Sequence, residues 1–118
     1  MSHLTDYAEN LLADMARGEG LTLAGNWTVH LLTAVTDSAH TKVTGTSYAG
    51  QTSPRSLTEW AGTQGAGTTL ASSGTSHRTS NNEFIDFGVA GAGGWSGPAI
   101  AVGLFNGSNL FAWADMDP

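Results

Sequence analysis

The sequence predicts a mostly β domain, of the small β-sandwich or jelly-roll-like type, with an amphipathic α-helix at its N-terminus. Three observations predict this class. Apolar residues recur at helical spacing only near the N-terminus, short apolar runs separated by glycine-rich turns follow, and an Asn-Gly pair separates the last two runs. One helix followed by several short strands is typical of a sandwich or a jelly roll.

The helix is expected over residues 1–18. Its apolar positions follow the spacing of one helical face, and they are Leu4, Ala8, Leu11, Leu12 and Met15. Acidic residues near the start and a basic residue near the end suit the helix dipole, and glycines then end the helix. We expect the apolar stripe to lie on the core of its own domain. The alternative is that part of the stripe packs on a neighbouring chain.

The β domain is expected over residues 20–118, with long loops. Alternating apolar and polar residues over 27–35 predict a half-buried strand. Residues 36–46 are polar and are expected to form a loop or a weak edge strand. Residues 50–82 are rich in glycine, threonine and serine and predict no definite element. Their isolated apolar anchors are Leu57, Trp60 and Leu70.

The last third of the chain carries the clearest strand signals. Aromatic and branched residues over 84–89 predict a short strand, and the glycine-rich residues 91–98 predict a turn or wide loop. Two apolar runs, 99–105 and 108–113, flank Asn106-Gly107. Asn-Gly tolerates the positive φ angles of a tight turn, so these runs are predicted to form a hairpin.

Composition and charge exclude several classes of function. A chain of 118 residues has the length of one domain, expected over residues 1–118. Four scattered Lys and Arg residues and a net charge of −6 argue against binding nucleic acid or an anionic membrane surface. No apolar run is long enough to span a membrane, and a signal peptide is not apparent. The protein is therefore expected to be made in the cytoplasm and used there or in something assembled there.

No group of residues suggests catalysis, a metal site or a cofactor. Cysteine is absent, and the four histidines lack metal-binding spacing. Glu83 and Asp86 lie three residues apart, which places them on opposite faces of a strand. The glycine run over 88–97 lacks the pattern of a phosphate-binding loop. A hydrolase or lyase would have only His77 and Glu83 to offer, so we expect no catalytic residue, no metal and no cofactor.

Aromatic residues are the better candidates for function. The chain has four tryptophans, and large aromatic side chains often anchor cores or interfaces. Trp95 lies in a glycine-rich loop, away from the predicted core. It is either an interface anchor or a ring folded back onto a sheet edge.

Several segments occur in the order and spacing of a known family. Residues 4–14 resemble its N-terminal helix, residues 27–34 its first strand, and residues 45–49 its Gly-x-x-Tyr-Ala segment. Its closing strands are similar to residues 87–89, 103–105 and 109–113. Through these segments the chain resembles a family of short bacteriophage virion proteins, labelled head decoration (cement) proteins or tail-fibre-like proteins. Residues 50–80 are covered poorly.

The resemblance implies a non-enzymatic structural protein of the virion. Its expected place is the phage head surface, where it would bind the lattice of the major capsid protein and stabilise the assembled head, as a dimer or trimer. The alternative is a tail-fibre or minor tail component that binds other tail proteins or host-surface glycans. The expected interface residues are Leu4, Tyr7, Leu11, Trp95 and Trp113.

Overall fold

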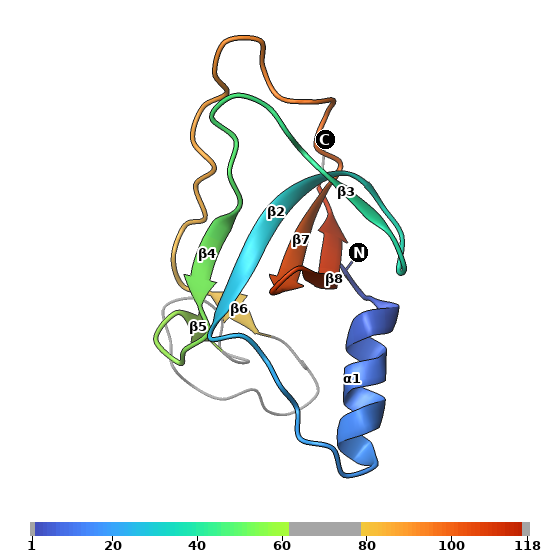
Figure 1. The fold of residues 1–118 in the computed structure, drawn as a ribbon. Helices are drawn as coiled ribbons and strands as arrows, with labels where there is room; N and C mark the ends of the chain where they lie inside the picture. Colours follow the sequence, from blue (N-terminus) through green and yellow to red (C-terminus); the bar gives the residue numbers. More distant parts are fainter. Residues whose placement is uncertain (1, 62–78, 117–118) are drawn as a thin grey trace.

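The computed structural model describes residues 2–61 and 79–116 and has one helix and antiparallel strands (Figure 1). The predicted class, mostly β with a short N-terminal helix, is confirmed. The elements are β1 (Ser2–Leu4), α1 (Asp6–Ala16), β2 (Asn26–Val35), β3 (His40–Lys42), β4 (Gln51–Pro54), β5 (Trp60–Ala61), β6 (Ser80–Asn81), β7 (Ala101–Asn106) and β8 (Asn109–Asp115).

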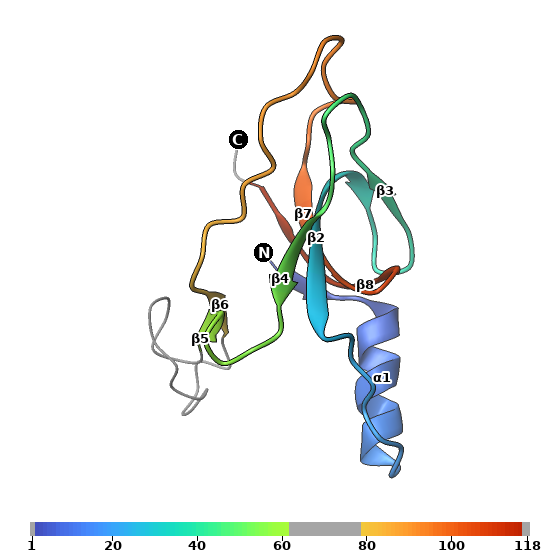
Figure 2. The ribbon, with the colours of Figure 1, turned by 60° about the vertical axis from the view of Figure 1, so that its left-hand side comes forward.

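The main sheet has six strands in the order β1-β8-β7-β2-β3, and β4 also pairs with β2. β5 and β6 form a separate two-stranded sheet (Figures 1 and 2). One principal sheet with a small second one does not confirm the jelly-roll arrangement. The mostly β class does not depend on that arrangement. Sequence signals for strands are local, so they do not predict how sheets are stacked.

Two strands share one edge of β2. Its first half, from Asn26 to Val29, pairs with β4, and its second half, from Leu32, pairs with β3. Leu31 lies between the two partners: its carbonyl accepts from the Val43 N–H at 2.9 Å, and its N–H donates to the Tyr48 hydroxyl at 2.9 Å. A side chain therefore completes the hydrogen bonding where neither neighbouring strand reaches.

The buried core lies on one face of the sheet. Phe105 and Leu32 are fully buried there, together with Ala101 and Leu110. These residues come from β2, β7 and β8, which the predicted hairpin and the predicted strand over 27–35 supply. The hairpin is confirmed: β7 and β8 pair directly, and Gly107 at their turn has a φ of 62°.

The helix is shorter than the predicted 1–18, because its first residues enter the sheet. Leu4 pairs with Ala112 as part of β1, and Thr5 then caps the helix by accepting from the Ala8 N–H at 3.3 Å. At the other end Gly18 has a φ of 103°, and its N–H donates to the Met15 carbonyl. A glycine in this conformation ends helices in the Schellman motif.

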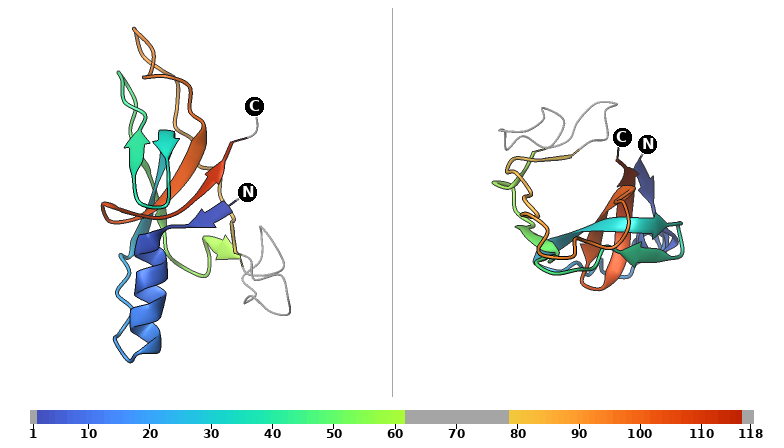
Figure 3. Two further views of the ribbon diagram at one scale, coloured as in Figure 1. Left: turned by 90° about the vertical axis from the view of Figure 1, so that its right-hand side faces the viewer. Right: turned by 90° about the horizontal axis from the view of Figure 1, so that it is seen from above.

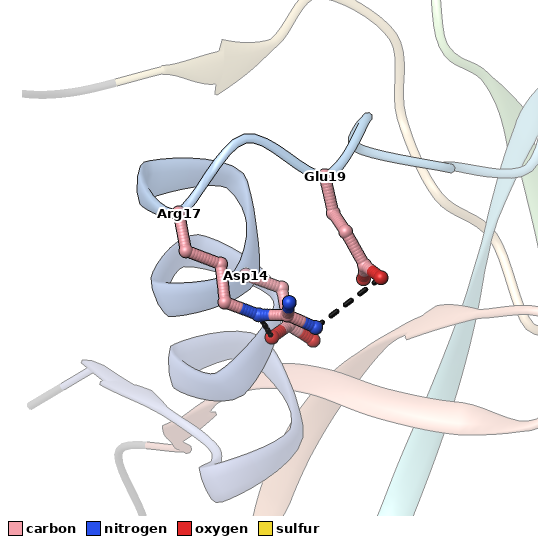
Figure 4. Close-up of polar contacts among 3 residues, drawn as sticks. All are labelled: Asp14, Arg17 and Glu19. Carbon is pink, nitrogen blue, oxygen red and sulfur yellow. Dashed lines mark hydrogen bonds and ion pairs between the residues drawn. The ribbon is translucent and has the colours of Figure 1, made fainter.

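Arg17 holds the end of the helix in place (Figure 4). Its guanidinium lies 2.8 Å from an Asp14 carboxylate oxygen and 3.2 Å from a Glu19 carboxylate oxygen. All three side chains are well exposed, so these ion pairs contribute little to global stability. Their effect is local: they support the last turn and the chain reversal that follows it.

The strand predicted over 84–89 is wrong. Residues 84–91 are outside every strand, and they run as a single segment beside β4 and up towards the loop before β7 (Figures 1 and 2). Ile85 and Phe87 are half-buried, whereas Phe84 and Val89 are exposed. Aromatic and branched residues favour a strand through their composition alone, and a strand also requires a hydrogen-bonding partner. The expected loop or weak edge strand over 36–46 contains β3, and the predicted anchor Leu70 lies outside the described residues.

Candidate interaction surfaces

The predicted contact residues near the N-terminus do not share one stripe. Leu4 lies in β1 and is 42% exposed, whereas Tyr7 and Leu11 lie on α1 and are half-buried. The Tyr7 hydroxyl accepts a hydrogen bond from the Asn106 side-chain amide at 2.8 Å. Tyr7 therefore connects the helix to the β7–β8 hairpin. An additional contact of these residues with a partner stays a prediction.

Asn106 is the central polar group of this connection. It is 8% exposed, and its side-chain oxygen also accepts from the Ala24 N–H at 2.7 Å. One amide group thus links the hairpin, the helix and the segment that returns from the helix to β2.

The C-terminal half of α1 extends beyond the sheet (Figures 1 and 3). Ala8 is the only buried residue among the helix positions, while Leu12 is 40% and Met15 is 47% exposed. Leu11, Leu12 and Met15, which we call the helix tip, continue the stripe that Ala8 begins. The sheet therefore covers the first part of the predicted apolar stripe and leaves the rest exposed.

A second apolar surface lies on the face of the sheet opposite the core. Ala112 pairs with Leu104 and Ala114 pairs with Val102, so these four side chains share that face. With Trp60 and Ile85 on the facing wall they line an open groove of about 240 Å³, which we call the sheet groove. All of its lining residues are uncharged. The sequence reasoning missed this groove; the continuous apolar runs of β7 and β8, which predict coverage of both faces, were the available signal.

Trp95 lies folded back onto a neighbouring loop. It forms an isolated bridge with Gly45, its indole N–H donates to the Thr46 carbonyl at 3.2 Å, and its ring meets Tyr48 edge-on at 5.2 Å. Both loops project at the end of the molecule opposite α1 (Figures 1 and 2). Trp95 holds these two loops together; its ring is folded back, but onto a loop and not onto the sheet edge of the second alternative. A contact with a partner stays a prediction.

Trp113 connects three parts of the structure. Its ring stacks on His3 with centroids 4.1 Å apart, and its indole N–H lies 3.4 Å from an Asp37 carboxylate oxygen. It also packs against the core cluster. Its role in binding a partner likewise stays a prediction.

A group of basic side chains surrounds the Phe105 ring. His30 and His40 both meet this ring edge-on, and the ammonium of Lys42 lies 4.5 Å from its centroid. Burial, followed by the charge of Lys42, lowers the pKa of both histidines, and His40 lowers the pKa of His30 further. Burial raises the pKa of Tyr48, whose hydroxyl lies 3.3 Å from His30 Nδ1. Both histidines therefore favour the neutral form more than a free imidazole does.

The described residues contain no cluster of three or more potential metal ligands, and none of their helices is long and apolar enough to cross a membrane. His77, which the sequence offered for an enzymatic role, lies outside the described residues. Glu83 is exposed. The arrangement offers apolar and aromatic contacts, and these are suited to holding other macromolecules.

Comparison with known proteins gives one family. A family model described as "Podophage GP4 fiber I protein gp80" matches residues 3–117, nearly the whole chain. No curated protein and no solved structure matches.

Proposed function

The chain belongs to the Podophage GP4 fiber I protein gp80 family, and from this premise we propose that it is a structural subunit of a phage fibre. Membership in a phage virion family agrees with the coarse expectation of a structural virion component and is consistent with a non-enzymatic role. The finer assignment to a fibre is supported by the shape of the molecule. It is elongated, with principal extents of 47 × 31 × 26 Å.

The observation that carries this proposal is the difference between the two ends. The helix tip projects at one end, and the loops containing Gly45 and Trp95 project at the other (Figures 1 and 2). A fibre subunit needs one end that attaches to a neighbour and another that continues or terminates the assembly. An apolar helix suits the attachment.

The two projecting loops are well ordered by their mutual contacts. The Ser96 N–H donates to the Thr44 carbonyl at 2.7 Å, and the Gly91 N–H donates to the Thr46 carbonyl at 3.0 Å. The Trp95 indole adds a third hydrogen bond between them. A surface held in one conformation loses little entropy on binding, which suits an end that contacts other tail proteins or host-surface glycans.

Decoration of the phage head is the second candidate, and the exposed helix tip is the observation that favours it. Leu12 and Met15 would dock on the lattice of the major capsid protein. Binding that occurs only on the assembled lattice stabilises it by mass action, by about 4 kcal/mol per site at a thousandfold excess over Kd. Many repeated sites would then reinforce the head.

The two candidates predict different images of the virion. We expect virions assembled without this protein to lack a fibre in electron micrographs and to keep the head disruption temperature of complete virions. A gold label on a C-terminal tag should mark the tail region. Labels distributed over the head surface, with a lower disruption temperature in virions that lack the protein, would refute the fibre assignment and support decoration.

A further inference from the structure

Two apolar features of the chain are left without partners by its own described residues. The helix tip extends past the sheet, and its Leu12 and Met15 are 40% and 47% exposed. The sheet groove is open and has an apolar lining. Isolated short helices are marginal in water, so a partner that packs on the helix tip would stabilise α1 further.

The groove has room for side chains of the size that the helix tip presents. An apolar cavity of about 150 Å³ accommodates a benzene molecule. At about 240 Å³ the groove is larger, which leaves space for two side chains such as Leu12 and Met15. The small side chains of Ala112 and Ala114 form its floor between larger neighbours, so a projecting side chain can approach the sheet closely.

The groove is also part of a wider apolar face. Leu4 shares that face through its pairing with Ala112, and it is 42% exposed. Ile100 and Met116 continue the alternation of β7 and β8 on the same face, since the Met116 N–H donates to the Ile100 carbonyl at 2.9 Å. Both are more than 40% exposed. Contiguous exposed apolar patches of this kind mark interaction sites.

Charge restricts the surfaces through which two copies of this chain can meet. Each chain carries a net charge of −6, so two copies repel wherever their charged surfaces meet. The groove lining is uncharged and the three helix-tip residues are apolar, while the carboxylate of Asp14 beside them is paired with Arg17. They are surfaces that identical acidic chains can bring together without opposing like charges.

The helix tip is also available as a defined shape. The helix contacts β8 and β1, and the end of the helix is held by the ion pairs of Arg17 with Asp14 and Glu19 (Figure 4). Its last turn is closed by the Gly18 hydrogen bond described above. A second chain therefore meets an ordered projection.

We propose that the helix tip of one copy inserts into the sheet groove of a second copy. The contact joins two different surfaces, so every copy in a chain of such contacts still offers one free tip and one free groove. Contacts of this heterologous kind build rings or open filaments. The inference rests on the proposed fibre function and supplies the contact by which its subunits repeat.

The test uses two pairs of matched variants of the full chain. Leu12→Asp places a charge on the helix tip. Ala13→Asp is its control, because Ala13 is two residues from both Leu11 and Met15 and so lies on the opposite face of the helix. Ile85→Asp charges the wall of the groove. Phe84→Asp is its neighbour, and Phe84 is fully exposed outside the groove. Circular dichroism melting curves establish that each variant is folded.

Sedimentation velocity over a concentration series then measures association. We expect the unmodified protein, Ala13→Asp and Phe84→Asp to form larger species as concentration rises. Leu12→Asp and Ile85→Asp should each raise Kd by more than about tenfold, the loss expected when one large apolar side chain is no longer buried. Each of these two variants alone should sediment as a monomer.

Mixing the two deficient variants gives the decisive result. Leu12→Asp keeps an intact groove and Ile85→Asp keeps an intact helix tip, so together they should form a 1:1 dimer that grows no further. Failure to form this dimer, or an unmodified protein that stays monomeric up to about 1 mM, overturns the proposal. The virion images test the fibre assignment separately. A protein that self-associates through this contact but is found on the head would refute the fibre assignment and leave the contact standing.

Discussion

Removing the side chain of Asn106 should destabilise the protein strongly, because this amide connects three segments. Asn106→Ala leaves the Ala24 N–H and the Tyr7 hydroxyl without the partners they have at 2.7 and 2.8 Å. Asn106 is buried, but Ala24 is exposed and Tyr7 is half-buried, so each lost hydrogen bond costs about 0.5–1.5 kcal/mol and we expect a loss of about 1–3 kcal/mol in the free energy of unfolding. For a domain of this size that corresponds to a fall of roughly 4–12 °C in Tm.

Urea denaturation followed by tryptophan fluorescence measures this loss. Tyr7→Phe is the matched control, because it removes one of the three hydrogen bonds of the Asn106 side chain and should cost about 1 kcal/mol. The double variant completes a cycle whose coupling energy isolates the contact between Asn106 and Tyr7. An Asn106→Ala variant within about 0.5 kcal/mol of the unmodified protein, the range of ordinary surface substitutions, would refute the reasoning.

Four further predictions concern single sites. Gly103→Ala should destabilise by about 1–3 kcal/mol in urea, because the added carbon would lie 2.8 Å from the nearest core side chain. Trp60→Phe should be neutral or stabilising in the same assay, because the buried indole N–H has no acceptor among residues 2–61 and 79–116, whereas Trp60→Ala should destabilise. The pKa of His30 is lowered in the folded protein, so the unfolded chain binds a proton more readily at this residue. The free energy of unfolding should therefore be constant above about pH 6.5 and fall as the pH drops below that value. His30→Gln should flatten this pH dependence. Trp95→Ala should release the two projecting loops, seen as faster amide exchange there, and should abolish any binding to a glycan array; unchanged exchange would contradict the structural role of Trp95.

Elements whose signal is local could be predicted from the sequence. The β7–β8 hairpin follows from Asn106-Gly107 between apolar runs, and β2 follows from the alternation that begins at Trp27. Leu4 fits the helical spacing, which predicts that it belongs to the helix. Nothing in the sequence around Leu4 indicates its pairing with Ala112, which is more than 100 residues away.

The candidate surfaces were harder to predict because they depend on what remains uncovered. The helical stripe was evident, but only the structure shows that it is covered at Ala8 and exposed at Met15. The groove combines Ala112 and Ala114 with Trp60, from a segment for which the sequence predicted no element. An alanine in a sequence gives no indication of a binding surface by itself. Ala112 and Ala114 belong to one because larger side chains surround them in the fold.

The arrangement at Leu31 has a consequence for how this protein can diverge. The Val43 N–H donates to the Leu31 carbonyl and the Tyr48 hydroxyl accepts from the Leu31 N–H, and these two hydrogen bonds complete the edge of β2 between its two partner strands. The chain leaves the sheet in this interval to form one of the projecting loops, and the ladders with β3 and β4 close independently on either side. Residues at the tip of this loop can therefore be exchanged or inserted without changing strand register, provided that Tyr48 is kept and that Gly45, where an added Cβ would lie 2.6 Å from the Gly94 carbonyl oxygen, stays glycine. The fold thus separates a part that must be conserved from a part that is free to adapt to new contacts.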